Sequence, residues 1–319
     1  MKRRSCTALL LVAAFGIAHA GEPPGLVGEV VASAASVPST SPQAAPLPSP
    51  SPSPPPTPAG RRLRYDLRID VPITAVGGVA WIVTESLKGS LAPRRCLHCD
   101  RAPDGSDALN PLDAAVRREL LLSRTGPPSA VSHAFAFGVM PLVALGVDAI
   151  LAQHDRRLRE WPVDALVIAE AAVLAADVNQ LVKFTVGRER PFVHVLPEDA
   201  KDMTRRPADN NLSFYSAHST LVFSLAVASG TVATLRGYRL APVLWASGLA
   251  VAATVGYLRI AADRHYFTDV LAGAAIGSVI GFVVPYLAHH PRWGWGHVRL
   301  GLAGGAPRGG VGLSLTGIF

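Results

Sequence analysis

Cationic side chains gather where one apolar stretch of the sequence ends. Lys183 directly follows the stretch 163–182, and Arg190 comes seven residues later, just before Pro191. Seven residues on a helix turn through about 700°, so the two side chains would point in nearly the same direction. The spacing therefore predicts that Lys183 and Arg190 can hold one anion between them.

A serine and a histidine open the next apolar stretch, residues 216–235. Ser216 and His218 would lie at its helical N-terminus. The free N–H groups and the positive dipole end of a helix N-terminus suit a phosphate. The pair thus predicts a second contact with the same kind of ligand.

A third group precedes the apolar stretch 270–288. His265 and Asp269 are four residues apart, so on a helix the carboxylate could hold one imidazole nitrogen, and Arg259 adds a cation. Each group alone is commonly a solvated charge, a cap or a structural pair. Together, two histidines, three cations and a hydroxyl at a helix N-terminus are what phosphoryl transfer through a covalent phosphohistidine requires.

The elements that must position these residues are apolar stretches of membrane-spanning length. They are residues 69–87, 130–152, 163–182, 216–235, 241–258 and 270–288. The fold class is therefore expected to be all-α, a membrane-embedded bundle of five to six helices. The first stretch is the weakest, because Asp70, Pro72 and two glycines interrupt it, and we expect it to be a partial or interfacial helix.

Short basic loops predict the orientation. Residues 154–160 and 236–239 are rich in arginine, and such loops stay cytoplasmic. The segments 183–215 and 259–269 then lie together on the opposite, periplasmic side of a bacterial inner membrane. A signal-like N-terminus conflicts with a full crossing by 69–87, because it places the preceding residues outside as well.

The remaining segments have compositions of their own. Residues 1–20 resemble a secretory signal peptide cut before Gly21, although an uncleaved membrane helix is the alternative. Residues 21–60, rich in Pro, Ser and Ala, are expected to be a disordered tether. Residues 61–290 are expected to form the helical domain, and the alternating tail 291–319 predicts a small β-hairpin.

Two cysteines remain after the signal segment, in "CLHCD". In an oxidising periplasm, Cys96 and Cys99 are expected to form a local disulfide. A zinc site needs about four ligands and only His98 is near, so a metal is disfavoured. A redox-active dithiol is conceivable, but the surrounding sequence is unlike a thioredoxin unit.

Composition narrows the class of partner. Charged residues make up 17% of the chain, below the roughly 25% of soluble domains, and the net charge of +7 is diffuse. A basic stripe interleaved with aromatic residues is missing from the sequence, so nucleic acid is not an expected partner. The expected partners are membrane lipids and an anionic substrate.

Three motifs give a resemblance to a known family. The segments "KFTVGRERP" (183–191), "YSAH" (215–218) and "LRIAADRHYFTD" (258–269) resemble the motifs Lys-x6-Arg-Pro, Pro-Ser-Gly-His and Ser-Arg-x5-His-x3-Asp. These belong to the type 2 phosphatidic acid phosphatase superfamily, which includes bacterial acid phosphatases and vanadium haloperoxidases. The resemblance covers residues 65–290, and three motifs in the same order are highly specific.

The resemblance implies a role for each matching residue. His265 resembles the nucleophile that attacks phosphorus, Asp269 the residue that orients it, and His218 the general acid. The phosphoryl oxygens would be bound by Lys183, Arg190, Arg259, Ser216 and the backbone near Ala217. This chain departs from the motifs at Tyr215, Ala217 and Leu258, and the methyl group of Ala217 could crowd the phosphate or restrict φ.

The sequence thus predicts a phosphatase acting on a phosphomonoester or pyrophosphate, best suited to a lipid because the site lies at the ends of membrane helices. No metal and no cofactor are expected, since protein cations supply the charge. The alternatives are a soluble periplasmic acid phosphatase, a vanadium-dependent haloperoxidase and a non-catalytic membrane protein that kept the fold. The uncharged stretches 241–258 and 270–288 argue against the first alternative, and the intact histidines argue against the last.

Overall fold

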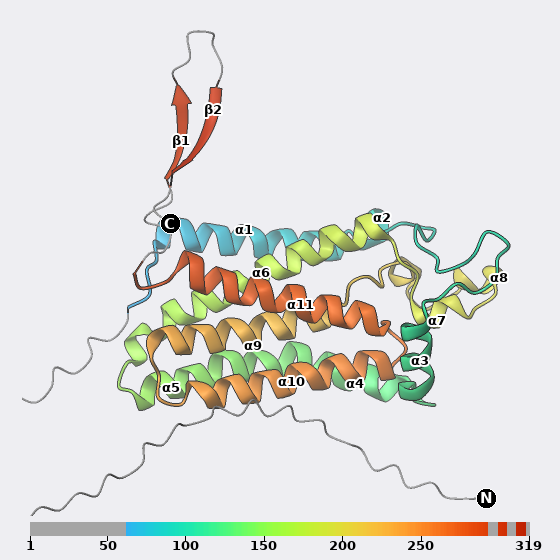
Figure 1. Cartoon of the computed structure of the whole chain (residues 1–319), viewed down its shortest axis with the longest axis horizontal. Coiled ribbons are helices and arrows are strands. Elements are labelled where there is room, and N and C mark those ends of the chain that lie inside the picture. The colour runs from blue at the N-terminus through green and yellow to red at the C-terminus, as the bar shows by residue number, and fades with distance from the viewer. Residues whose placement is uncertain (1–61, 293–298, 305–310, 317–319) are drawn as a thin grey trace, which may run out of the picture. The chain divides into compact units, whose positions relative to one another are not determined.

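A computed structural model of the chain describes residues 62–292, 299–304 and 311–316. The chain divides into two units, residues 1–55 and 56–319, and every described element belongs to the second. The expected signal peptide and tether, residues 1–60, lie outside the described residues. What is described is a bundle of long helices and one short pair of strands (Figure 1).

Among the described residues, six helical segments are long and apolar enough to cross a membrane, which agrees with the predicted all-α bundle. They are α1 (Leu67–Ser86), the run of α4 (Gly126–Ala134), η1 (Phe135–Val139), η2 (Leu142–Val147) and α5 (Asp148–His154), η3 (Leu158–Glu160) with α6 (Trp161–Val186), α9 (Ala217–Arg236), α10 (Ala241–Ala261), and α11 (Phe267–Val283) with η5 (Val284–Ala288). The stretch expected to be partial is therefore a continuous helix, α1. Its incomplete crossing stays a prediction.

Helix α9 is the centre of the bundle. It packs against α6, α10 and α11, and 83% of its apolar window is buried, compared with 6% of that of α1. Helix α11 approaches it closely because Gly277 and Gly281 face its backbone. A Cβ atom added at these glycines would lie 2.4 Å from the carbonyl oxygen of Thr220 and 2.5 Å from that of Ser224. Without side chains at these positions, the N-termini of α9 and α11 can lie next to each other.

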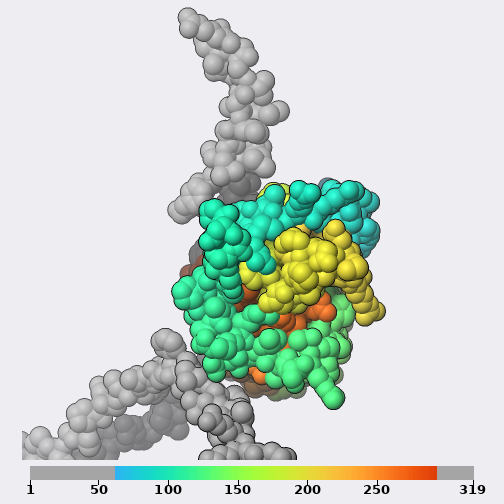
Figure 2. All heavy atoms as spheres, turned by 90° about the vertical axis from the view of Figure 1, so that its right-hand side faces the viewer, coloured from blue at the N-terminus to red at the C-terminus, as the bar shows by residue number. Residues whose placement is uncertain are grey.

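Short helices lie in the segments that connect the long ones at the end where α6 stops. They are α2 (Lys88–Leu91), α3 (Pro111–Leu120), α7 (Pro191–His194), α8 (Glu198–Lys201) and η4 (Pro207–Asp209). Figure 2 views this end, where the teal segment between α1 and α4 and the yellow segment after α6 cover much of the surface. The sequence predicted no helix between the apolar stretches 69–87 and 130–152, so α3 was missed.

The tail forms the predicted hairpin. Strand β1 (Arg299–Gly304) pairs antiparallel with β2 (Val311–Thr316), with Arg299 opposite Thr316 and Gly304 opposite Val311. The alternation of apolar and small residues about a Gly/Pro-rich turn was the signal for this pairing.

Candidate active site

Helix ends bring all the predicted site residues to one end of the bundle. Lys183 lies in the last turn of α6 and Arg259 in the last turn of α10. Ser216 is the N-cap of α9, and Asp269 lies in the first turn of α11. Neighbouring N-termini of α9 and α11 are joined directly, since the Ser216 N–H donates to the carbonyl oxygen of Asp269 at 3.0 Å.

Lys183 and Arg190 reach the site by a different route from the one predicted. Helix α6 ends at Val186, and Gly187 takes a left-handed conformation with φ 57°. Arg190 is therefore not on the helix of Lys183 but is the N-cap of α7. The two side chains therefore do not share a helix face as predicted, because the chain turns at Gly187. They still interact electrostatically.

The three cations are buried and have few acceptors. Arg190 donates from Nε to the carbonyl oxygen of Asp209 (2.7 Å) and from Nη1 to that of Arg264 (3.3 Å). Arg259 donates from Nη1 to Ser132 Oγ (3.3 Å), while its buried Nε has no hydrogen-bond partner among the described residues. Lys183 Nζ makes no hydrogen bond with the described part of the chain. Buried positive charge of this kind is costly unless an anion compensates it.

Asp209 is a carboxylate that interacts electrostatically with all three cations. It forms an ion pair with Lys88, with Nζ 3.2 Å from Oδ1, rather than with Lys183 or Arg190. Burial raises the pKa of Asp209, but Arg190, Lys88 and Lys183 outweigh that effect and leave the pKa below its ordinary value. The charge of Asp209 offsets only part of the positive charge of Lys183, Arg190 and Arg259, as an anion site requires.

His265 is buried beside these cations, with 2% of its surface exposed. Burial, followed by the charges of Arg190, Arg259 and Lys183, lowers the pKa of His265 well below 6.5. The ring is therefore neutral at physiological pH. Its Nδ1 lies 2.8 Å from the carbonyl oxygen of Ser213, which can only accept, so Nδ1 carries the proton and Nε2 keeps its lone pair. A neutral imidazole with a free Nε2 is a competent nucleophile.

Asp269 does not hold His265 directly, contrary to the sequence prediction. Its Oδ2 lies 3.8 Å from His265 Nδ1, beyond hydrogen-bond range. Helix α11 begins at Phe267, so His265 precedes it and the helical four-residue spacing does not apply. Instead, Asp269 accepts hydrogen bonds from the Ser213 hydroxyl (2.5 Å) and the Tyr266 N–H (2.9 Å). The Ser213 carbonyl oxygen contacts the imidazole of His265, and Tyr266 follows His265 in the chain.

Arg188 is a site neighbour that lies within the first motif segment, 183–191, but received no role from the sequence. Its Nη1 donates to Asp269 Oδ1 at 2.7 Å, and its guanidinium lies 4.2 Å from the centre of the Tyr266 ring. Burial would lower the pKa of Arg188, but Asp269 and Asp100 raise it above its ordinary value, so the group is always charged. The left-handed turn at Gly187 directs Arg188 to this position, and the sequence gives no sign of its partner.

His218 lies on the other side of the site, half-buried in the first turn of α9. Its Nε2 is 3.4 Å from His133 Nδ1 on α4. The ring of Phe137, on η1, stands edge-on to it with 5.3 Å between centroids. Neither His133 nor Phe137 carries a motif that could have identified it from the sequence.

Ser216 caps the N-terminus of α9. The Ser216 hydroxyl accepts from the Ser219 N–H at 3.3 Å, as an N-cap does. Ala217 is the first helical residue and is not among the residues with positive φ. The backbone therefore does not need the glycine that the family motif has there, which removes one of the two expected difficulties.

A disulfide lies against the segment that carries Arg188. Cys96 and Cys99 are joined in the structure, with Cα atoms 5.3 Å apart. The Leu97 N–H donates to the Gly187 carbonyl oxygen at 2.9 Å, and the Glu189 N–H donates to that of His98 at 3.2 Å. The loop thus pairs with the backbone between Lys183 and Arg190. Oxidation of the pair in cells stays a prediction.

One group among the described residues has the composition of a metal site. The carboxylates of Asp70 and Glu170 and the imidazole of His289 are buried and lie within 4.8 Å of one another. His289 Nε2 is 3.2 Å from Glu170 Oε2, so an ion pair already explains part of the group. It contains none of the predicted site residues.

Comparisons with known proteins agree with the motifs. Residues 164–293 match the family model of the PAP2 superfamily. The decaprenylphosphoryl-5-phosphoribose phosphatase of Mycobacterium tuberculosis is 28% identical over 190 residues, which are 58% of this chain and 92% of that protein.

Two solved structures are similar to the chain. The transmembrane PAP2 type phosphatidylglycerolphosphate phosphatase from Bacillus subtilis is 17% identical, with a TM-score of 0.42, and the match covers 65% of this chain and 93% of that one. LpxE from Aquifex aeolicus is 22% identical, with a TM-score of 0.39, and the match covers 55% and 96%. The three motifs lie at adjoining helix ends and all fall within residues 164–293, the part of the chain that matches the PAP2 superfamily, whose members are phosphoric-ester hydrolases.

Proposed function

We propose that the protein is a membrane phosphatase that removes phosphate from a phosphorylated lipid through a phosphohistidine at His265. The observation that carries the proposal is a neutral, buried imidazole facing three buried cations, with a second imidazole and an apolar groove beside it. Lys183, Arg190 and Arg259 would bind the phosphoryl oxygens and stabilise the charge that develops on them.

The reaction has two steps. His265 Nε2 attacks phosphorus while the bond to the leaving oxygen breaks, and His218 gives that oxygen a proton. Water then attacks the phosphohistidine, His218 takes a proton from it, and phosphate leaves with His265 neutral again. Asp269 supports the positive charge that His265 acquires in the intermediate, acting through Ser213 and the backbone of Tyr266.

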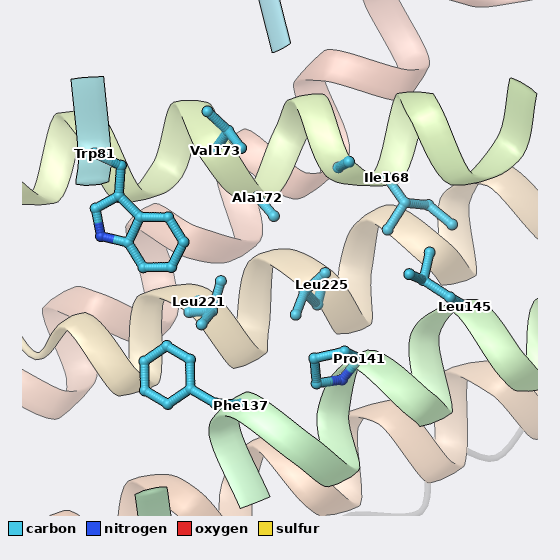
Figure 3. Close-up of a pocket in the computed structure, with 10 residues that line it drawn as sticks. Trp81, Phe137, Pro141, Leu145, Ile168, Ala172, Val173, Leu221 and Leu225 are labelled. Carbon is cyan, nitrogen blue, oxygen red and sulfur yellow. The ribbon is translucent and has the colours of Figure 1, made fainter. Parts of the chain in front are cut away.

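The leaving-group side of the site favours a lipid. A groove of about 240 Å³ opens between α1, η1, α6 and α9, and its exposed lining is entirely apolar. Figure 3 shows Trp81 and Phe137 at one part of this groove and Leu145 and Ile168 at another. Phe137 lines the groove and also contacts His218, so a chain attached to the leaving oxygen has an apolar surface to follow.

The distribution of charge supports one side of the membrane for the site. Arginines at 156, 157 and 159, and at 236 and 239, lie at the end of the bundle away from the site. Positive loops stay cytoplasmic, which supports a periplasmic active site in a bacterial inner membrane. Cysteines introduced singly at 157 and 200, in a variant lacking the native ones, test this in spheroplasts with an impermeant thiol reagent. Labelling at 200 and protection at 157 is the expected result, and the reverse pattern places the site inside.

Phosphate release from a panel tests the function itself. The purified protein should hydrolyse phosphatidic acid, phosphatidylglycerol phosphate or a polyprenyl pyrophosphate faster than glycerol phosphate or p-nitrophenyl phosphate. Filling the groove with Ala172→Phe should raise KM for long-chain substrates and leave short-chain analogues unchanged. Leu181→Phe, on the same helix but 66% exposed, is the control. Equal rates on soluble and lipid esters, unaffected by Ala172→Phe, contradict a lipid substrate.

A further inference from the structure

Helix α3 lies outside the residues that match the family model, yet one of its side chains is built into the active-site end. Asp113 is fully buried, with 0% of its surface exposed. Its Oδ1 accepts from the Thr268 N–H (2.9 Å), and its Oδ2 accepts from Thr268 Oγ1 (2.7 Å) and Arg188 Nη2 (3.0 Å). The N-cap residue of the helix, Asn110, also contacts this carboxylate, because its Nδ2 donates to Asp113 Oδ2 at 2.6 Å.

The contacts continue from Asp113 to the nucleophile. Arg188 joins Asp113 to Asp269 by donating to both carboxylates, and Nε of the same guanidinium donates to Asp100 at 2.8 Å. Asp269 in turn accepts from the Ser213 hydroxyl, and the Ser213 carbonyl oxygen accepts from His265 Nδ1. A series of short contacts between buried groups thus runs from α3 to the imidazole.

We propose that Asp113 is a positioning residue for the nucleophile: with Arg188 it fixes the Asp269 carboxylate, and through Ser213 it fixes the ring of His265. This inference rests on the proposed function of His265. It assigns a role in the reaction to a helix that the three motifs do not include.

The geometry explains why an ionised carboxylate is needed at this position. A guanidinium presents its donors in a rigid plane, so partners on several of its nitrogens fix its orientation. Burial raises the pKa of Asp113, but the hydrogen bonds from Thr268, Asn110 and Arg188 outweigh it, and the pKa lies below its ordinary value. An amide in its place would present an N–H₂ group to Arg188 or Thr268, where only acceptors fit.

The helix offers matched controls. Arg117, one turn further along α3, donates from Nε to Asp263 Oδ1 (2.7 Å) and from Nη2 to Oδ2 (2.8 Å). Arg117→Gln therefore loosens α3 from the same loop without a direct contact to Arg188 or Asp269. Glu119, paired with its neighbour Arg118 and 73% exposed, provides a surface control in Glu119→Gln.

The test compares these variants of the full-length protein in detergent for kcat, KM, melting temperature and affinity for phosphate and vanadate. Asp113→Asn should lower kcat by about 10- to 100-fold, because a small misplacement of a reacting group costs that much. Its KM and phosphate affinity should stay near those of the wild type, since the three cations are untouched. Vanadate, which bonds to the nucleophile as the transition state does, should bind about tenfold more weakly. Glu119→Gln should match the wild type.

The outcomes separate positioning from stability. A fall in kcat for Arg117→Gln as large as for Asp113→Asn, at an equal loss of melting temperature, overturns the proposal and makes α3 a structural brace. Adding Asp113→Asn to Arg188→Gln should cost little further activity, because both act on one carboxylate; full additivity contradicts the series of contacts.

Failure of the proposed function gives a different pattern. In one outcome, the wild type hydrolyses nothing in the panel and still binds vanadate more tightly than the Asp113→Asn variant. That result refutes the phosphatase assignment and leaves the positioning role intact. An active wild type whose kcat and vanadate affinity are unchanged by Asp113→Asn refutes the positioning alone.

Discussion

Ser213→Ala separates the two contacts that Ser213 makes with His265 and Asp269. The Ser213 carbonyl oxygen accepts from His265 Nδ1 at 2.8 Å, and an alanine backbone keeps this bond. The Ser213 hydroxyl donates to Asp269 Oδ2 at 2.5 Å, and alanine removes it. Asp269 retains the Tyr266 N–H and Arg188, so the carboxylate stays buried and paired.

The size of the effect follows from the kind of bond that is lost. A hydrogen bond to a charged group contributes about 1.5 to 3 kcal/mol. Since about 1.4 kcal/mol corresponds to a factor of ten in rate, full expression in the transition state lowers kcat by about 10- to 150-fold. In the proposed mechanism, His265 becomes cationic only after it attacks phosphorus, and Asp269 then supports its charge, so we expect the loss to fall on kcat rather than KM.

The assay is phosphate release under saturating and limiting substrate, with circular dichroism melting of the same samples. Ser229→Ala is the matched control, because that hydroxyl is equally buried on α9 and bonds only to the Ala226 carbonyl oxygen, at 3.2 Å. Ser213→Ala with the kcat of the wild type, or with a loss no larger than that of Ser229→Ala, refutes the role given to the hydroxyl.

Three further predictions concern pH, metal and the cysteines. Burial, followed by the charges of Arg190, Arg259 and Lys183, lowers the pKa of His265 well below 6.5, so below pH 6.5 the unfolded chain binds a proton at this residue that the folded chain does not. The free energy of unfolding should therefore fall as pH drops below 6.5. The acid limb of kcat/KM due to His265 should lie well below pH 6.5, and a limb at 6.5 in a pH–rate profile contradicts this. Activity should survive EDTA, since protein cations bind the phosphate, and loss in EDTA that Mg²⁺ restores counts against the site. Cys96 and Cys99 should resist alkylation in acid-trapped cells until a reductant is added, and free thiols there contradict a periplasmic loop.

The bundle could be predicted because apolar runs of membrane length leave little choice of element. The helix-end placement of Ser216 and Arg259 followed from the same runs. Geometry inside the site could not be predicted in the same way, because it depends on where helices stop. Helix α6 stops at Gly187 and α11 starts after His265, and each boundary changed a contact argued from helical spacing.

The polar neighbours of the site show the same limit from another direction. Arg188 stands in a motif segment, but its partners Asp100 and Asp113 lie about 80 residues earlier in the chain, and periodicity does not link residues so far apart. Asp113 sits on a short amphipathic helix among loop-forming residues. Its burial comes from tertiary packing, which a local pattern does not report.

The central claim is that His265 becomes phosphorylated during turnover, and acid-sensitive protein labelling tests it most directly. The protein is mixed with a ³²P-labelled lipid phosphate, quenched with alkali and separated by electrophoresis. The wild type should carry label that is stable to alkali and lost in acid, as a phosphohistidine is, and His218→Ala should be labelled more slowly. His265→Ala should carry none and should release no phosphate. Label on His265→Ala, or turnover near that of the wild type, would contradict the account.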